Sequence, residues 1–206
     1  MRADGFVEYE GLWWKLALPQ VILAVHLGVA AWAATYAGWR SHLGWRVVAP
    51  GLAAGWALWT LFEYVFHRWL LHDTRHRLRK RIFWHGLHKE HHGYRSMSDP
   101  DHHGIHVAIS QPIVLAVVGL TAWASSGGFE VSAAAGWVVG YCAYEGLHWL
   151  FHSADEPRGP ATVRRLWRAH AMHHLRRADL NFGFVTTFWD RRFGTFADLE
   201  STPRSA

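Results

Sequence analysis

Four long stretches of the chain are almost entirely apolar, and they dominate the pattern of hydrophobic and polar positions. They cover residues 16–38, 47–66, 105–125 and 129–151, and none has a lysine or arginine in its interior. Each is close to the roughly 20 residues that a helix needs to cross the hydrocarbon core of a bilayer. The pattern therefore predicts an all-α membrane protein with four transmembrane helices. A soluble bundle of buried helices is the alternative interpretation.

The polar segments between these stretches differ strongly in charge. Most lysines and arginines follow the second stretch or the fourth, whereas the turn after the first carries only Arg40 and Arg46, and the turn after the third carries none. Basic segments near membrane spans stay on the cytoplasmic side. We therefore expect two transmembrane hairpins, with the polar segments forming a helical cytosolic cap and both termini on the cytoplasmic side.

Composition supports a single lipid-associated domain over residues 1–206. Half of the residues are hydrophobic, and the net charge is +5. The distribution of that charge fits membrane topology and anionic headgroups, so we expect no nucleic-acid partner. Cys142 is the only cysteine, which excludes an intrachain disulfide and a thiolate metal site. Any metal must be bound through nitrogen or oxygen.

Histidine is the unusual polar residue, with 17 in the chain. Ten of them form four spaced groups beside the ends of the apolar stretches: His67 and His72; His88, His91 and His92; His148 and His152; His170, His173 and His174. Residues three or four apart share a helix face, so most members of a group can project together. His67 and His72 are five apart, about 140° on a straight helix. They suit two different ions, or a helix that breaks between them.

These groups predict a metal centre. Neutral imidazole binds iron, zinc, copper and nickel, so the ligand type alone does not select the metal. Ten imidazoles exceed the capacity of one ion, and two ions with about five ligands each fit the number. Glu145 lies one helical turn before His148 and could accept the second N–H of a ligand imidazole. A salt bridge with a nearby arginine is the alternative for Glu145.

Three motifs resemble the fatty acid hydroxylase/sterol desaturase superfamily of integral-membrane di-iron enzymes, and the fatty acyl 2-hydroxylase branch in particular. They are Glu63-Tyr64-x2-His67-Arg68-x3-His72, the run from His88 to His92, and the segment from His170 to Thr195 with its Asn-Phe-Gly-Phe string. The resemblance covers residues 55–195. It implies two iron ions, with zinc possible in purified protein, and O2 as co-substrate. The ligands that it implies are His67, His72, His88, His91, His92, His148, His152, His170, His173 and His174.

The function implied by the resemblance is hydroxylation of a lipid C–H bond, with the fatty acyl chain as the expected substrate. A desaturase or a hydroxylase acting on a sterol or carotenoid is the first alternative, and a membrane metal-binding or transport protein is the second. No haem-binding segment precedes the first apolar stretch, so we expect a separate electron-donor protein. Residues 93–103 are longer than in the acyl 2-hydroxylases, and the roles of four further histidines stay open: His85, His102, His103 and His106.

Overall fold

A computed structural model describes residues 12–42, 44–72, 75–81, 84, 88, 92, 107–125, 127–153 and 156–198. Within these ranges the chain is helical and contains no strand, which confirms the predicted all-α class. The elements, in chain order, are α1 Leu12–Arg40, α2 Trp45–Phe66, the π-helix η1 His67–Leu71, α3 Arg77–Arg79, α5 Val107–Ala124, α6 Gly128–Ser153, α7 Ala161–Leu175 and α8 Phe188–Phe193.

The four long helices α1, α2, α5 and α6 coincide with the four apolar stretches of the sequence. Helix α6 packs against the other three, and its longest contact is with α2. Glycines allow that contact, because a Cβ atom at Gly55 would collide with the carbonyl oxygen of Ala133, and one at Gly136 with that of Leu52. The two backbones therefore approach closely enough to fix the spacing of the residues that follow them.

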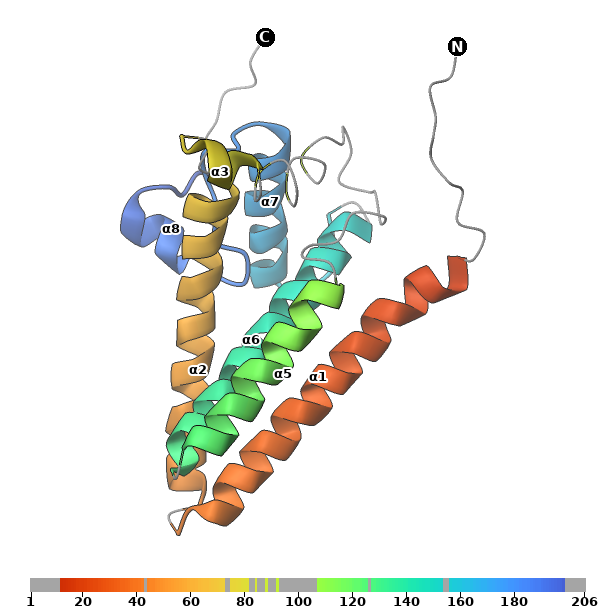
Figure 1. The fold of residues 1–206 in the computed structure, drawn as a ribbon. Helices are drawn as coiled ribbons and strands as arrows, with labels where there is room; N and C mark the ends of the chain where they lie inside the picture. Colours follow the sequence, from red (N-terminus) through yellow and green to blue (C-terminus); the bar gives the residue numbers. More distant parts are fainter. Residues whose placement is uncertain are drawn as a thin grey trace.

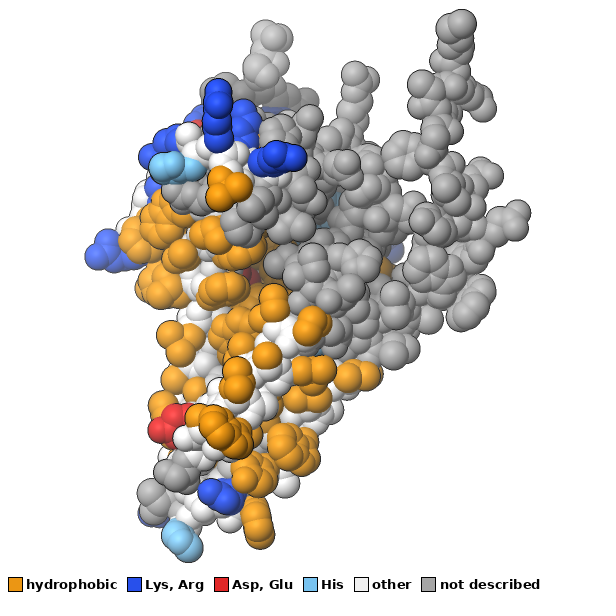
Figure 2. Space-filling model, viewed as in Figure 1, with side chains coloured by type: hydrophobic (Ala, Val, Ile, Leu, Met, Phe, Trp, Pro, Cys, Tyr) orange, Lys and Arg blue, Asp and Glu red, His pale blue; other side chains and the backbone are white. Residues whose placement is uncertain are grey.

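The surface of the helical body is rich in large apolar side chains. Leu58 on α2 is 59% exposed, and Leu120 and Trp123 on α5 are 63% and 85% exposed. Figure 2 shows hydrophobic side chains spread along the body. No helix within the described ranges combines the length and the apolar character needed to cross a membrane. The four helices are therefore confirmed, and their crossing of a membrane stays a prediction.

The short helices gather at one end of the body and form a cap. Figure 1 shows α3, α7 and α8 beside the C-terminal ends of α2 and α6, while the α1–α2 connection lies at the opposite end. Lysine and arginine side chains cover much of this cap in Figure 2, where Arg75, Arg77, Lys80 and Arg81 are exposed. The cap brings together the ends of α2 and α6 and the helix α7, and these segments carry most of the predicted histidine groups.

Candidate metal centre

The π-helix η1 determines how His67 and His72 project. The N–H of His72 donates to the carbonyl oxygen of His67 at 3.2 Å, which is the five-residue hydrogen bond of a π-helix. Residues five apart therefore lie one turn above each other here, and the two Nε2 atoms are 3.2 Å apart. The wider turn places both imidazoles at one site, so the pair does not serve two separate sites.

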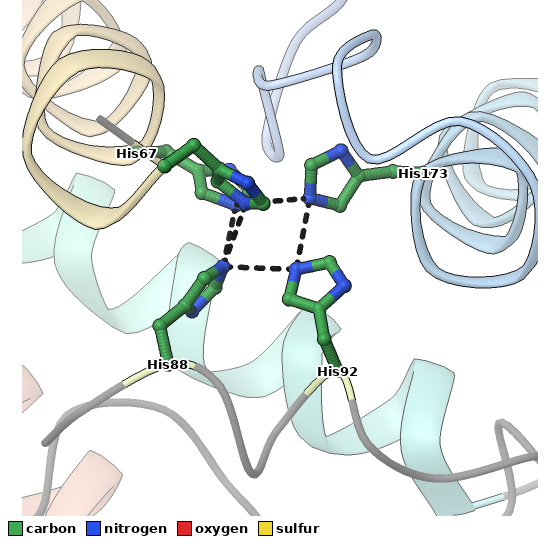
Figure 3. Close-up of side chains that lie close together, drawn as sticks. His67, His88, His92 and His173 are labelled. Atoms are coloured by element: carbon green, nitrogen blue, oxygen red, sulfur yellow. Dashed lines mark hydrogen bonds between the residues drawn. The ribbon is translucent and has the colours of Figure 1, made fainter. Parts of the chain in front are cut away.

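Five histidines from segments far apart in the sequence converge at the end of α2. This five-histidine cluster consists of His67, His72, His88, His92 and His173. The Nε2 atom of His88 lies 2.9 Å from those of His72 and His92, and the Nε2 atom of His173 lies 3.1 Å from the same two atoms. Figure 3 shows the rings pointing their nitrogen atoms inward, with these short approaches drawn as dashed lines.

The spacing of these nitrogen atoms fits a coordinated transition metal. Metal–imidazole bonds are about 2.1 Å long, so two ligands at a right angle have nitrogen atoms about 3.0 Å apart. The recorded Nε2–Nε2 approaches of 2.9 to 3.2 Å match that edge. All five donor atoms lie within 4.8 Å of one another, as donors around one ion must. The residues therefore fit a transition-metal ion held by several imidazoles.

Backbone carbonyl groups fix the tautomer of two imidazoles in this cluster. The Nδ1–H of His67 donates to the carbonyl oxygen of Phe182 at 2.8 Å, and that of His173 donates to Leu180 at 2.6 Å. Each Nε2 therefore carries a lone pair aimed into the cluster. Desolvation lowers the pKa of His67 to about 3, and His173 adds to the effect. Converging neutral lone pairs repel each other unless a cation lies among them, which favours a metal site.

A second group, the three-histidine cluster, comprises His148, His152 and His170. His148 and His152 lie four apart on α6, and the Nε2 atom of His152 is 3.0 Å from that of His170 on α7. All three side chains are buried. This cluster needs only two helices to form, because α6 and α7 each present their histidines on the facing sides.

Helix α7 divides its three histidines between the two clusters. His173 belongs to the five-histidine cluster and His170 to the three-histidine cluster. The ring of His174 stacks on His92 with centroids 4.3 Å apart, and its centroid is 4.4 Å from that of His170. His174 therefore lies between the clusters, and α7 connects them.

The loop between α7 and α8, residues 176–187, supplies an aromatic ring to each cluster. The ring of Phe182 lies 5.5 to 5.7 Å from those of His67, His72 and His173. The ring of Phe184 lies 4.5 Å from His170 and 5.0 Å from His148. Both phenylalanines are buried, so this loop forms an apolar wall against each site.

Two buried carboxylates hold the amide groups of this loop. Asp190 accepts the N–H groups of Phe182 and Gly183, each at 2.8 Å, and Glu63 accepts those of Phe184 and Val185 at 2.9 and 2.8 Å. Four consecutive amides are thus bound by carboxylates from α8 and α2. Burial raises the pKa of Asp190, while hydrogen bonds from Thr195, Gly183 and Phe182 and the charge of Arg68 oppose that rise.

A cavity of about 50 Å³ opens between the clusters and the aromatic side chains of α2 and α6. His67 and His88 line it from one cluster, and His148 and His170 from the other. The remaining lining residues are mostly aromatic or apolar: Trp59, Phe62, Phe66, Leu71, Tyr141, Tyr144, Phe182, Phe184 and Glu63. An apolar chamber beside metal ligands suits a hydrocarbon group.

Eight of the ten predicted ligands lie in one cluster or the other, and a ninth, His174, lies between them. The tenth, His91, lies outside the described residues, as do His85, His102, His103 and His106. Glu145 is half-buried, and among the described residues its Oε1 atom has no hydrogen-bond partner. Its predicted support of His148 stays a prediction.

Sequence reasoning missed the role of the α7–α8 loop. It assigned no function to the two phenylalanine rings, and it did not foresee that backbone carbonyls would orient His67 and His173. The signal that could have indicated this is Gly183, where a Cβ atom would meet the Oδ2 atom of Asp190 at 2.7 Å and the carbonyl oxygen of Thr186. A glycine between two aromatic residues marks close backbone approach.

The fold and the clusters define an all-helical, histidine-rich protein with a candidate metal centre beside an apolar cavity. The sequence profile named fatty acid hydroxylase matches residues 52–195. Because this match covers well over half of the sequence, the chain belongs to the fatty acid hydroxylase family.

Individual relatives are consistent with that membership. The chain is 28% identical over 206 residues to the dihydroceramide fatty acyl 2-hydroxylase FAH2 of Arabidopsis thaliana, covering 95% of this chain and 78% of the relative. It is 29% identical over 154 residues to FAH1 of the same plant, covering 72% of this chain. The ceramide very long chain fatty acid hydroxylase SCS7 of Saccharomyces cerevisiae is 27% identical over 195 residues, covering 89% of this chain. The chain spans only 61% of FAH1 and 45% of SCS7.

A solved structure shares the fold. The hydroxylase domain visible in full-length scs7p superimposes with a TM-score of 0.66 at 24% sequence identity, covering 94% of this chain and 69% of that one. At 24% identity this likeness shows a shared helical fold.

Proposed function

We propose that this protein hydroxylates a fatty acyl chain, using O2 and two metal ions, one in each histidine cluster. The observation that carries the proposal is the apolar cavity lined by histidines of both clusters. The names of FAH1 and FAH2, dihydroceramide fatty acyl 2-hydroxylases, favour carbon 2 of the acyl chain as the position that is oxidised.

The metal we propose is iron, because the relatives are hydroxylases and imidazole-bound iron carries out O2 chemistry. The five-histidine cluster would hold one ion, and His148, His152 and His170 would hold the other. When bound, the iron pair supplies the redox chemistry that cleaves O2 and oxidises the C–H bond.

The protein's own residues position the substrate and keep the site dry. The walls formed by Phe62, Phe182 and Phe184 offer apolar contact to methylene groups and exclude water. With a volume of about 50 Å³, the cavity admits the reacting segment of a chain rather than a whole lipid. The N–H···O=C bonds of His67 and His173 keep both imidazoles aimed at the cluster throughout the reaction.

We also propose that the helical body is embedded in a membrane with the cap on the cytoplasmic side. Support comes from exposed apolar side chains along α2 and α5, including Leu58 and Leu120, and from basic residues gathered on the cap. Alkaline carbonate extraction of membranes tests the embedding, because an integral protein stays in the pellet. Single cysteines introduced in a Cys142→Ser background at Arg75 and at Trp45 should then react with an impermeant thiol reagent from opposite sides.

A separate electron-donor protein completes the proposed reaction. Inserting one oxygen atom of O2 into a C–H bond and reducing the other to water consumes two electrons. We propose that a redox protein delivers them to the cap, where both clusters lie.

The decisive experiment is lipid analysis of cells that express the chain. We expect 2-hydroxylated acyl chains, seen as a gain of one oxygen in mass, and their loss in the His173→Ala variant. His76→Ala is the matched control, because His76 is exposed at the start of α3. Loss of two hydrogens from the acyl chain would instead identify a desaturase, and unchanged lipids with soundly expressed protein would contradict the proposal. Purified protein should contain about two metal ions per chain by elemental analysis.

A further inference from the structure

The peptide group between Phe182 and Gly183 connects a ligand imidazole to a buried carboxylate. Its carbonyl oxygen accepts the Nδ1–H of His67 at 2.8 Å, and its N–H donates to the Oδ2 atom of Asp190 at 2.8 Å. The two hydrogen bonds use the carbonyl oxygen and the N–H of one peptide group, which point in opposite directions. A donor bond from the N–H makes the carbonyl of the same peptide a stronger acceptor, because hydrogen bonds in series polarise one another.

We propose that Asp190 is a positioning residue for the five-histidine cluster, acting on His67 through the Phe182–Gly183 peptide group. Histidine ligands commonly donate their second N–H directly to a carboxylate, which fixes the ring and raises its basicity as a ligand. Here one peptide group stands between the imidazole and the carboxylate. The inference rests on the proposed metal centre and adds a residue that the ligand set does not contain.

Asp190 is itself held by a chain of donors. Its Oδ1 atom accepts the Thr195 hydroxyl at 2.7 Å, Thr195 accepts from Tyr64 at 3.0 Å, and Tyr64 accepts from the Arg68 guanidinium at 2.7 Å. The hydroxyl groups of Thr195 and Tyr64 can both donate in the direction of the carboxylate at the same time. A cation thus supports the negative charge of a fully buried aspartate across two hydroxyl groups.

Gly183 makes the connection possible. A Cβ atom at this position would lie 2.7 Å from the Oδ2 atom of Asp190 and would also meet the carbonyl oxygen of Thr186. The carboxylate can therefore reach the amide of residue 183 only when that residue has no side chain. The close approach of Asp190 to Gly183 allows the hydrogen bond between the carboxylate and the peptide N–H.

His173 provides an internal contrast. Its Nδ1–H donates to Leu180, and the N–H of the same peptide group, from Asn181, donates to the carbonyl oxygen of Thr195 at 2.8 Å. Both ligands are thus linked through one peptide group, but the link from His173 ends on a neutral carbonyl and the link from His67 on a carboxylate. The structure therefore singles out His67 as the ligand that Asp190 can influence.

The test measures Co2+ affinity of the metal-free full-length protein in detergent, by visible absorption, with one cluster disabled at a time. A His148→Ala/His170→Ala background retains the five-histidine cluster, and a His72→Ala/His88→Ala background retains the other. We expect Asp190→Asn to weaken Co2+ binding about 10- to 100-fold in the first background and by less than about 3-fold in the second. Both carboxylate oxygens of Asp190 accept hydrogen bonds, so an amide must mismatch one donor.

The matched control is Asp179→Asn, which makes the same chemical change within the loop whose amides Asp190 binds. Asp179 is exposed and ion-paired with Arg177, so Co2+ affinity should stay within about 3-fold of the parent in both backgrounds. The inference is overturned if Asp190→Asn leaves the five-histidine cluster within about 3-fold, or if it weakens both clusters equally. Failure of the first background itself to bind Co2+ would overturn the proposed metal centre along with it.

If Asp190→Asn does not fold, the unmodified protein supplies the measurement. Filling the five-histidine cluster with Zn2+ should polarise the connected peptide group and move the Gly183 amide proton downfield in the NMR spectrum. The amides of Phe184 and Val185 are the internal reference. They also donate to a carboxyl group, that of Glu63, whereas the described imidazole bonds of the loop go to the carbonyl oxygens of Phe182 and Leu180. Equal shifts for the three amides would overturn the inference.

Discussion

The two histidine clusters are built by different means. The three-histidine cluster takes its donors from two helices, α6 and α7, whose regular spacing places them face to face. The five-histidine cluster needs a π-helix, two residues from the segment after α3, and a loop whose carbonyl groups orient two rings. One site is thus a product of helix geometry, and the other depends on irregular backbone held by buried hydrogen bonds.

Because they are built differently, the two clusters should be sensitive to different substitutions. The three-histidine cluster has few described donors on a rigid support, so each donor should matter greatly and its surroundings less. The five-histidine cluster has more donors, and its weak point should be the loop.

The largest effect should come from removing a donor of the smaller cluster. His170→Ala leaves two described donors, His148 and His152, and we expect metal content to fall from about two ions per chain to about one. Product formation should drop at least about 100-fold. His92→Ala is the comparison, because the larger cluster keeps four donors and should retain its ion with reduced affinity. Elemental analysis checks both variants. Two ions per chain in His170→Ala would contradict the expectation that the three-histidine cluster needs each of its donors.

Asn181 should be the most stability-sensitive position of the loop. It has a positive φ of 56°, and its side chain bonds the carbonyl oxygens of Ala169 and Ala197 and the amide of Ala197. Asn181→Ala loses these bonds and strains the left-handed backbone, which should lower the free energy of unfolding by about 2 to 4 kcal/mol. Asn181→Gly loses the same hydrogen bonds but tolerates the positive φ without strain, so it should cost about 1 kcal/mol less than Asn181→Ala. Thermal unfolding in detergent measures both, and equal stability of the two variants would contradict the role of φ.

The sequence predicted the helices well because their signal is local. Each apolar stretch became one long helix, and the spacing within His148-x3-His152 correctly placed both rings at one site. Residues three and four apart share a face whatever the tertiary structure, so no distant contact was needed for these inferences.

The partition of the ligands could not be predicted for a physical reason. The two possibilities for His67 and His72 differ in whether the helix keeps the hydrogen bonds between residues four apart. The π-helix at the end of α2 departs from that pattern, and the spacing of the two histidines does not indicate the change. The division of His170 and His173 between clusters also depends on where α7 lies relative to α2 and α6. The roles of Phe182 and Asp190 arise from contacts between residues 181–198 and the rest of the cap, which no spacing encodes.

The two phenylalanines should affect the clusters separately. Phe182→Leu removes ring contacts with His67, His72 and His173, and Phe184→Leu removes those with His148 and His170. Aromatic pairs contribute about 0.5 to 1.5 kcal/mol beyond burial, so each change should weaken Co2+ binding about 2- to 12-fold at its own cluster. Leucine keeps most of the buried volume and limits the general loss of stability. Weakening of both clusters by either change would show that the loop is a shared support.

The smallest effect should come from the exposed end of the same loop. Arg177 forms a bidentate ion pair with Asp179, with both N–O distances at 2.8 Å. The two side chains are 51% and 67% exposed. Exposed pairs contribute little because water and salt screen them, so Arg177→Ala should leave the melting temperature and the Co2+ affinity of both clusters essentially unchanged. The variant separates the buried hydrogen bonds of the loop from its surface charges. A clear loss of Co2+ binding at the five-histidine cluster alone would mean that the ion pair orients Leu180 and, through it, His173.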